Sequence, residues 1–379
     1  MTRPDEFSIR VHVASDSGLG RRVSRRTVLR GGAAAAFLLG LPTIAACGSD
    51  DETDEGGSGG TAGLKVYGFD SIISKDTLNK MSVELVPFST TDEGLARLQT
   101  GSEGLDLMVI DSAYAQGAID QKLFQPLPKD RLKNFGNLDP LAKGQAWDPE
   151  EEFTFVKGYA MVGWAFNKSD FPDGVGSTWA DVFEAIKGPA SKKFVTYPDG
   201  GLLAVTYFLA NGIDPASPTD AQIDEAERYW VEELAPHILE FPPLPEMAVS
   251  QGTANLMMVA SGYLRPALLD TGDPESWGFQ ATQALRFVDV WGILAGAERV
   301  DAALEFLDYM LTPEAAITEM LGVGVSIPVK GVELPADTQL KDLVIRPESE
   351  VATATSMAFG DKTARYSALF EAVQTAAAS

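Results

Sequence analysis

From residue 64 onward, short apolar segments alternate with segments that carry helix-start signals, and this alternation constrains the fold most strongly. Residues 105–110 are almost continuously apolar, as a strand buried on both faces of a parallel sheet requires. Thr90 with Glu93, and Thr219 with Gln222, have the spacing of helix capping boxes. Strands that alternate with helices in this way predict an α/β protein with mixed, parallel-rich sheets. Strands are expected at residues 64–69, 83–88, 105–110, 159–166, 193–197, 256–259 and 287–294, and helices at 90–98, 178–186, 200–209, 219–234, from 312 and at 361–377.

The first 46 residues have the composition of an export signal rather than of a folded segment. Arg25 and Arg26 precede a charge-free stretch of 16 residues at 31–46, which is followed by Cys47, the single cysteine of the chain. This order is typical of a signal peptide. The arginine pair resembles a twin-arginine export signal, and residues 44–47 resemble a bacterial lipobox. We therefore expect residues 1–46 to be cleaved and Cys47 to be lipidated, with the twin-arginine and general secretory routes both open.

An uncleaved membrane anchor is the alternative for this leader, but the charge-free stretch is shorter than the roughly 20 apolar residues that span a bilayer. The lone cysteine agrees with the lipoprotein interpretation, because an exported domain without a second cysteine forms no internal disulfide. Residues 47–63 are rich in Gly, Ser and acidic residues without apolar periodicity, which predicts a flexible tether.

Composition limits the classes of function. The formal net charge of −24 disfavours nucleic acid and anionic lipid surfaces as partners. His237 is the one histidine beyond the leader, and the chain contains no Gly-x-Ser-x-Gly elbow, no HExxH pair and no P-loop. Nucleophilic, zinc and phosphoryl chemistry therefore lack their usual groups, and a hydrolase built on two carboxylates is the enzyme class left open. We expect no enzyme activity, no cofactor and no metal.

Several segments after the tether resemble, in the same order, bacterial solute-binding proteins of the spermidine/putrescine type. The resemblance covers essentially the whole chain beyond the tether and rests on residues 101–114, 123–127 with 137–140, 177–183, 288–297 and 304–314.

This resemblance implies a type II periplasmic-binding-protein-like fold with two α/β lobes. The crossing strands between the lobes would lie at 162–167 and 287–294. Lobe 1 would comprise residues 64–160 with about 290–315, and lobe 2 about 161–289 with 316–379.

The resemblance also implies a function: a monomeric substrate-binding lipoprotein of an ABC importer. Such a protein captures a small cationic solute, a polyamine or a related amine, between its lobes. It then delivers the solute to a permease and an ATPase at the outer face of the cytoplasmic membrane. A non-transporting sensor lipoprotein, or a binder of an amphoteric or anionic solute, remains open. Genomic neighbourhood would discriminate between import and sensing.

A cleft for an amine needs carboxylates to pair with ammonium groups and aromatic faces to contact methylenes and cations. Residues carried over from the family pattern as ligand contacts are Phe69, Asp70, Ser112, Tyr114, Asp199, Phe287 and Asp289. Each has an alternative: Asp199 could cap a helix, Asp289 could be a paired buried acid, and Phe69 and Tyr114 could belong to the core.

The chain also departs from the family pattern. Leu202 stands where the resemblance implies a glutamate, the segment beginning at Ala260 lacks an expected tryptophan, and Val323 stands where a tyrosine is expected. These departures argue against copying spermidine as the ligand. Arg265 and Arg286 flank the expected cleft, and either one pointing inward would favour an amphoteric or anionic ligand.

Overall fold

The computed structural model describes residues 60–70, 72–88, 91–356 and 362–379. The chain divides into two compact units, Met1–Glu55 and Gly56–Ser379, and only the second contains described residues. The predicted signal peptide with Arg25, Arg26 and Cys47 lies outside the described residues, as does most of the tether. Thr90 of the first expected capping box lies outside them as well.

Within the described residues, nine strands form one mixed sheet in the order β2-β1-β3-β8-β4-β7-β5-β6, with β9 paired to β8. Strands β1, β2 and β3 are parallel, as are β5, β6 and β7, in agreement with the parallel-rich sheets predicted; β6 was not among the expected strands. Their bounds are β1 Lys65–Phe69, β2 Glu84–Phe88, β3 Leu107–Asp111, β4 Thr154–Asn167, β5 Phe194–Val195, β6 Ile238–Glu240, β7 Leu256–Ala260, β8 Trp277–Ile293 and β9 Thr355–Ser356.

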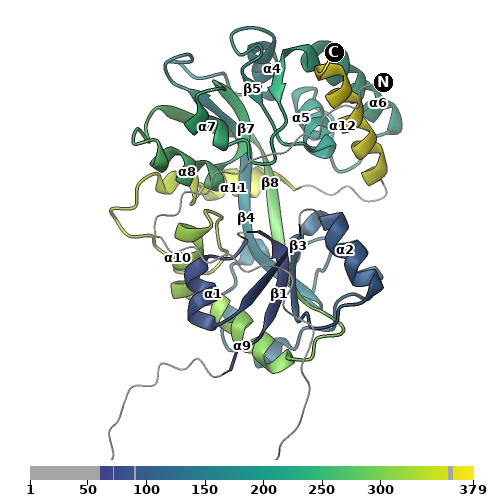
Figure 1. Ribbon diagram of the computed structural model, residues 1–379, viewed down its shortest axis with the longest axis vertical. Helices are drawn as coiled ribbons and strands as arrows, with labels where there is room; N and C mark the ends of the chain where they lie inside the picture. The colour runs from purple at the N-terminus through teal and green to yellow at the C-terminus, as the bar shows by residue number, and fades with distance from the viewer. Residues whose placement is uncertain (1–59, 71, 89–90, 357–361) are drawn as a thin grey trace, which may run out of the picture. The chain divides into compact units, whose positions relative to one another are not determined.

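The long antiparallel strands β4 and β8 join the two parallel groups of strands (Figure 1). The C-terminal part of β8 pairs with β3, and the C-terminal part of β4 pairs with β7. The β4–β8 ladder shifts register twice, between Val156 and Gly158 and between Val162 and Trp164. Such bulges increase local twist and redirect side chains. Both strands begin earlier than expected: the first residues of β4 include the polar Thr154 and Lys157, and the first half of β8 includes polar, partly exposed positions, which break the apolar pattern.

Helices cover the sheet on both sides of these long strands. Capping boxes start α4 at Thr178 with Asp181 and α6 at Thr219 with Gln222. Their bounds are α1 Lys75–Met81, α2 Thr91–Thr100, α3 Ala115–Asp120, α4 Trp179–Lys187, α5 Gly200–Ala210, α6 Asp220–Tyr229, α7 Met247–Gln251, α8 Ser261–Asp270, α9 Val300–Met310, α10 Pro313–Gly322, α11 Glu348–Thr353 and α12 Thr363–Ala377.

The helix expected over 219–234 is not uniform. It ends as an α-helix at Tyr229 and continues through a π-type turn at Trp230–Leu234. The indole of Trp230 donates a hydrogen bond to the carbonyl of Leu203 at 2.8 Å, and the buried ring packs edge-on against Phe183. Tertiary packing of this tryptophan therefore accompanies the change of helix type.

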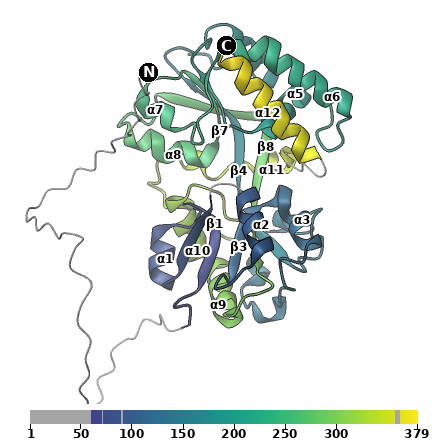
Figure 2. The same ribbon diagram turned by 45° about the vertical axis from the view of Figure 1, so that its right-hand side comes forward.

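Two large hydrophobic clusters pack against the sheet, one beside each group of parallel strands. The first cluster contains buried residues from 64–156 and 288–315, and includes Trp291. The second contains buried residues from 160–260 together with Leu285 and residues from 316–373, and includes Trp164. Helix α12 packs against α5 and α6 over the second cluster, while α10 contacts α1 (Figure 2). Among the helices of the described ranges, none combines the length and apolarity of a bilayer-spanning helix.

Candidate functional site

Two aspartates lie directly opposite each other where β3 meets β8. Asp111 is the last residue of β3, and its register partner on antiparallel β8 is Asp289. Directly opposed residues share one face of the sheet with their Cβ atoms about 4.5–5.5 Å apart. The carboxylate of Asp111 accepts a hydrogen bond from the N–H of Ala113 at 2.7 Å, which caps the short 3₁₀ helix Ser112–Tyr114. This pair provides two acidic groups at one point of the sheet.

A third carboxylate comes from the other parallel group of strands. Asp199 follows β5 and caps α5, where it accepts the N–H of Leu202 at 3.0 Å. The charge of Asp199 acts on Asp111, so the two groups are within electrostatic reach although they belong to opposite halves of the sheet. Asp199 therefore caps a helix, as the alternative interpretation held. It nevertheless lies close enough to Asp111 for its charge to act on that residue.

Burial controls the protonation of this three-carboxylate cluster, which consists of Asp111, Asp199 and Asp289. Burial raises the pKa of Asp111 to about 8, the Ala113 hydrogen bond opposes this, and the charges of Asp289 and Asp199 add to the rise. Burial likewise raises the pKa of Asp289 to about 6, against the positive charge of Lys157. It also raises the pKa of Asp199, which the backbone hydrogen bonds of Leu202 and Gly201 partly offset. A cation placed here would favour the charged forms and displace protons.

Aromatic side chains border the same cluster. Phe287 precedes Asp289 by two residues and therefore shares its face of β8. Its ring packs edge-on against Tyr197, with centroids 6.2 Å apart, and the hydroxyl of Tyr197 accepts the N–H of Ala260 at 3.1 Å. Burial raises the pKa of Tyr263, near the start of α8, and the charges of Asp289 and Asp111 raise it further. Phe287 and Tyr263 thus border Asp289, and Tyr197 packs against Phe287.

The other residues expected in the site lie near its edge or in the core. Ser112 is buried directly after Asp111, and Tyr114 is half-buried against the first cluster. The ring of Phe69 packs edge-on against Phe88 at a centroid distance of 4.6 Å, which is a core contact. Asp70 is exposed just beyond β1, at the same edge of the sheet as Asp111 because β1 and β3 are parallel.

The three departures from the family pattern lie in packed surroundings. Leu202, Ala260 and Val323 are all buried in the second cluster. The aromatic bulk expected near Ala260 is supplied in part by Tyr197 and Tyr263, which come from neighbouring segments.

The two arginines that flank the expected cleft have other surroundings. The guanidinium of Arg265 donates to the carbonyl of Gln339 at 2.9 Å and to that of Leu321 at 3.5 Å. Strand alternation puts Arg286 on the face of β8 opposite to Phe287 and Asp289. On that face, burial and the charge of Asp139 raise the pKa of Tyr159, and the positive charge of Arg286 opposes this rise. The residues around the carboxylates therefore favour a cationic group over an anionic one.

Sequence reasoning missed four residues of this environment: Asp111, Lys157, Tyr197 and Tyr263. A signal existed for Asp111, since it ends the apolar run of β3 just before Ser112. A signal also existed for Lys157, a lone lysine in an otherwise apolar strand. Tyr197 and Tyr263 carried none, because their approach depends on the turn after β5 and the start of α8.

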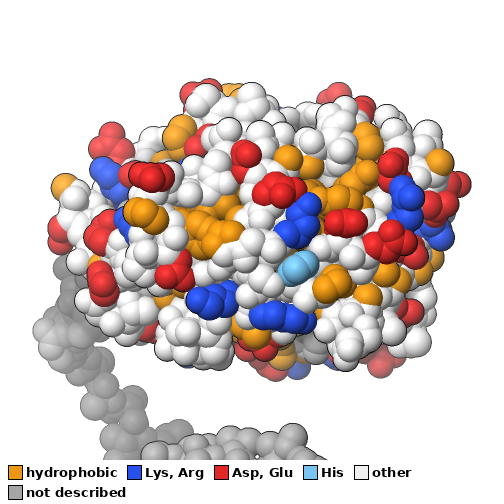
Figure 3. Space-filling view, turned by 90° about the horizontal axis from the view of Figure 1, so that it is seen from above, with side chains coloured by type: hydrophobic (Ala, Val, Ile, Leu, Met, Phe, Trp, Pro, Cys, Tyr) orange, Lys and Arg blue, Asp and Glu red, His pale blue; other side chains and the backbone are white. Residues whose placement is uncertain are grey.

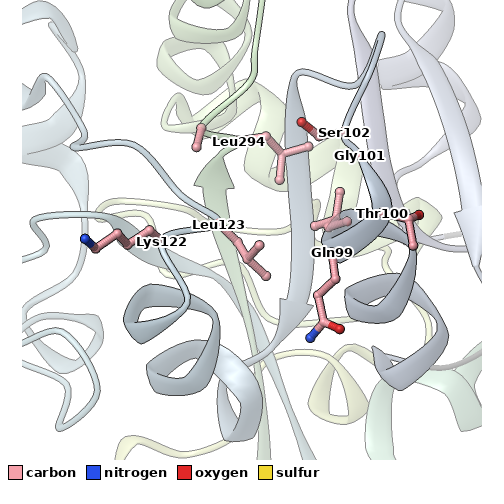
Figure 4. Close-up of a pocket in the computed structure, with 9 residues that line it drawn as sticks. Gln99, Thr100, Gly101, Ser102, Lys122, Leu123 and Leu294 are labelled. Atoms are coloured by element: carbon pink, nitrogen blue, oxygen red, sulfur yellow. The ribbon is translucent and has the colours of Figure 1, made fainter.

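A separate hollow of about 310 Å³ lies at the other end of β3 and β8 (Figure 4). It is lined by residues 98–102 with Lys122, Leu123, Leu294 and Ala295. Leu107 pairs with Ile293 at this end of the ladder and Asp111 with Asp289 at the opposite end. The hollow is therefore distinct from the carboxylate cluster, and it has no acidic lining residue. In the described ranges, no cluster of three or more His, Cys, Asp or Glu residues is arranged to hold a metal ion.

Comparisons with known proteins identify the family of the chain. The sequence profile of a family described as bacterial extracellular solute-binding proteins matches residues 74–345. The putrescine-binding periplasmic protein of Escherichia coli is 25% identical over 276 residues, covering 66% of this chain and 74% of that protein. The spermidine/putrescine-binding periplasmic protein of Salmonella typhimurium is 25% identical over 303 residues, covering 76% and 81%.

A solved structure supports the fold. The spermidine/putrescine ABC transporter substrate-binding protein of Streptococcus pneumoniae superposes with a TM-score of 0.69 at 18% identity, covering 83% of this chain and 99% of that one. The predicted fold class, a two-lobe α/β fold of the periplasmic-binding-protein type, is confirmed by this likeness.

Proposed function

Because the chain belongs to the bacterial extracellular solute-binding proteins, we propose that it is the substrate-binding component of an ABC importer that captures a small cationic solute. The predicted resemblance to the spermidine/putrescine type is confirmed at the level of the family. The observation that carries the proposed ligand class is the cluster of Asp111, Asp199 and Asp289 with Tyr197 and Phe287 beside it.

Physical chemistry supports an amine. An ammonium group offsets the repulsion between carboxylates that burial already disfavours in their charged forms. Aromatic faces attract cations by roughly 0.5–2 kcal/mol each. The relatives named above bind putrescine and spermidine by their names, and a polyamine or related amine is therefore the ligand class we propose. Phe69, Asp70, Ser112 and Tyr114 stay in the proposal as contacts at the margin of the site.

The arrangement of strands supports capture by closure. Asp111 and Asp289 belong to the β3–β8 ladder beside the first cluster, whereas Asp199 and Tyr197 follow β5 in the second. We propose lobe boundaries near residues 160, 290 and 315, with β4 and β8 as the crossing strands. A ligand that contacts both lobes favours the closed form, which a permease and its ATPase would recognise.

The proposal includes export and a lipid anchor. Cleavage after residue 46, lipidation of Cys47 and use of a twin-arginine route would place a monomer at the outer face of the cytoplasmic membrane. The acidic tether would hold the folded body away from anionic lipid. Figure 3 shows acidic and basic side chains interspersed over one face of the body, and with a net charge of −24 this surface suits neither nucleic acid nor anionic lipid. We propose binding without covalent chemistry.

A ligand panel tests the proposal. The purified full-length chain is heated with putrescine, spermidine, neutral amino acids, sugars or dicarboxylates, and its melting temperature is measured. A ligand selective for the folded state raises that temperature, by an amount that grows with the logarithm of its concentration over Kd. We expect amines to raise it and dicarboxylates to leave it unchanged. A rise with dicarboxylates and none with any amine would overturn the proposed ligand class.

A further inference from the structure

A buried lysine lies directly behind the candidate ligand site. Lys157 occupies the bulge of β4 between Val156 and Gly158, and Gly158 is the register partner of Asp289. Only 2% of Lys157 is exposed, and within the described part of the chain its Nζ has no hydrogen-bond partner. Nζ lies 5.8 Å from the centroid of the Trp291 ring. Because Trp291 and Asp289 alternate onto the same face of β8, the ammonium group lies on the face that carries the acidic pair.

The surroundings of Lys157 make this placement costly unless a charge compensates it. The side chain borders a small cavity of about 10 Å³, room for about one water molecule, whose other lining residues are all apolar. An ammonium group among apolar side chains costs several kcal/mol when it is unpaired. The positive charge of Lys157 lowers the pKa of Asp289. A methionine would fill the same space without this cost, which argues for an electrostatic function of the lysine.

The three carboxylates are held differently. Asp111 and Asp199 each accept a backbone N–H, from Ala113 and Leu202 respectively. No backbone N–H of the described residues donates to Asp289, and its compensating partner is the charge of Lys157. One positive charge is therefore already present inside the cluster before any ligand binds.

We propose that Lys157 is a built-in counter-ion of Asp289, and that it leaves the site with the charge to accept one ammonium group rather than two. This inference rests on the proposed function and assigns its ligand class: a small organic monoamine in preference to a linear diamine or triamine. Asp111 and Asp289 are direct register partners, and two carboxylates that oppose each other favour sharing one proton, in agreement with the raised pKa of Asp111. Before a ligand binds, this pair then carries one negative charge, ionised Asp199 carries a second, and Lys157 carries one positive charge, so that their sum is a single negative charge.

Two amines of equal length test the charge count. The Kd values of n-butylamine and 1,4-diaminobutane for the full-length wild-type chain are measured by titration calorimetry at neutral pH. We expect the monoamine to bind at least as tightly as the diamine. A preference for the diamine of about tenfold or more, or 1.4 kcal/mol, would overturn the inference while leaving the proposed function intact. If neither amine binds and a solute of another class does, the proposed function itself fails.

Lys157→Met tests the residue, since it keeps a linear side chain and removes the charge. We expect the Kd ratio to move about tenfold toward the diamine, and the pH below which binding is lost to rise because Asp289 loses its cation. The groups that face Asp289 are Asp111 from β3, Lys157 from β4 and Tyr263 from α8. An unchanged ratio together with an unchanged pH profile would remove Lys157 from the site.

The matched control is Lys187→Met. Lys187, in α4, also lies 5.8 Å from an aromatic centroid, that of Tyr229, and pairs with Glu184 away from the cluster. This change should alter neither the ratio nor the pH profile. Where Lys157→Met does not fold, Lys157→Gln is measured in its place, and the wild-type comparison of the two amines decides the charge count without any variant.

Discussion

Replacing Asp111 with Asn should stabilise the ligand-free protein at neutral pH, although it removes an ionisable group from the candidate site. Burial, opposed by the Ala113 hydrogen bond and increased by Asp289 and Asp199, raises the pKa of Asp111 from 3.8 to about 8. Between these values the unfolded chain has released the proton and the folded chain still holds it. The free energy of unfolding therefore decreases as the pH rises from about 4 to about 8, and the stability is fully present only below that window.

The magnitude follows from the same values. One pKa unit corresponds to about 1.4 kcal/mol, so Asp111 titrating alone would cost the folded state about 4 kcal/mol at pH 7. Because the charges of Asp289 and Asp199 act on Asp111, the three groups do not titrate independently, and we expect about 2–4 kcal/mol. Asn keeps the side-chain oxygen that accepts the N–H of Ala113 at 2.7 Å, so the cap survives the change.

Urea denaturation of the wild type and of Asp111→Asn, measured at several pH values between about 5 and 8, checks this prediction. The stability difference should favour the variant and grow by about 1 kcal/mol per pH unit. Asp173→Asn, the same change at an exposed position, should follow the wild type throughout. If Asp111→Asn is less stable than the wild type at pH 7, or if its stability changes with pH in parallel to the wild type, then the carboxyl is not buried as described.

Asp289→Asn should weaken amine binding by about 2–5 kcal/mol, as loss of one partner of a buried charge pair does; calorimetry would show this, and equal affinity for the variant and for Asp173→Asn would remove Asp289 from the site. Gly262→Ala should lower the free energy of unfolding by about 1–3 kcal/mol or more, because a Cβ there would overlap the carbonyl oxygen of Gly324; an unchanged thermal transition would contradict this close backbone approach. Cys47→Ala should move the protein from the membrane to the soluble fraction, and continued retention in the membrane pellet would contradict lipidation.

The sequence predicts much of the fold because its patterns are local. The capping pair of Thr219 with Gln222 forms as expected. The apolar run before Asp111 is a parallel strand. The first half of β8 was not expected, because residues such as Gln280 and Thr282 are polar and only partly buried. A strand whose faces pack against different neighbours along its length does not keep one regular alternation of polar and apolar residues.

The site is predictable only where sequence order implies spatial order. Asp289 and Phe287 share a strand face, so two candidates two residues apart necessarily lie together. Asp111 and Lys157 reach the same place through strand pairing and a bulge, which no local pattern reveals. Phe69 was expected near the ligand, yet its ring packs on Phe88, since a residue at the end of a strand can turn either to the core or to the edge.

In the proposed function, the acids that would bind the ligand are also the groups that disfavour closure without it. Asp111 and Asp289 lie beside the first hydrophobic cluster, and Asp199 follows β5 beside the second. Burial raises the pKa of all three carboxylates, and the charges of Asp289 and Asp199 add to the rise at Asp111; we propose that closure of the lobes is what desolvates them. An ammonium group between them removes this penalty only in the closed form, and a ligand shifts a conformational equilibrium by its differential affinity for the two states. The same buried acids that lower the stability of the empty protein thus make closure depend on a cation.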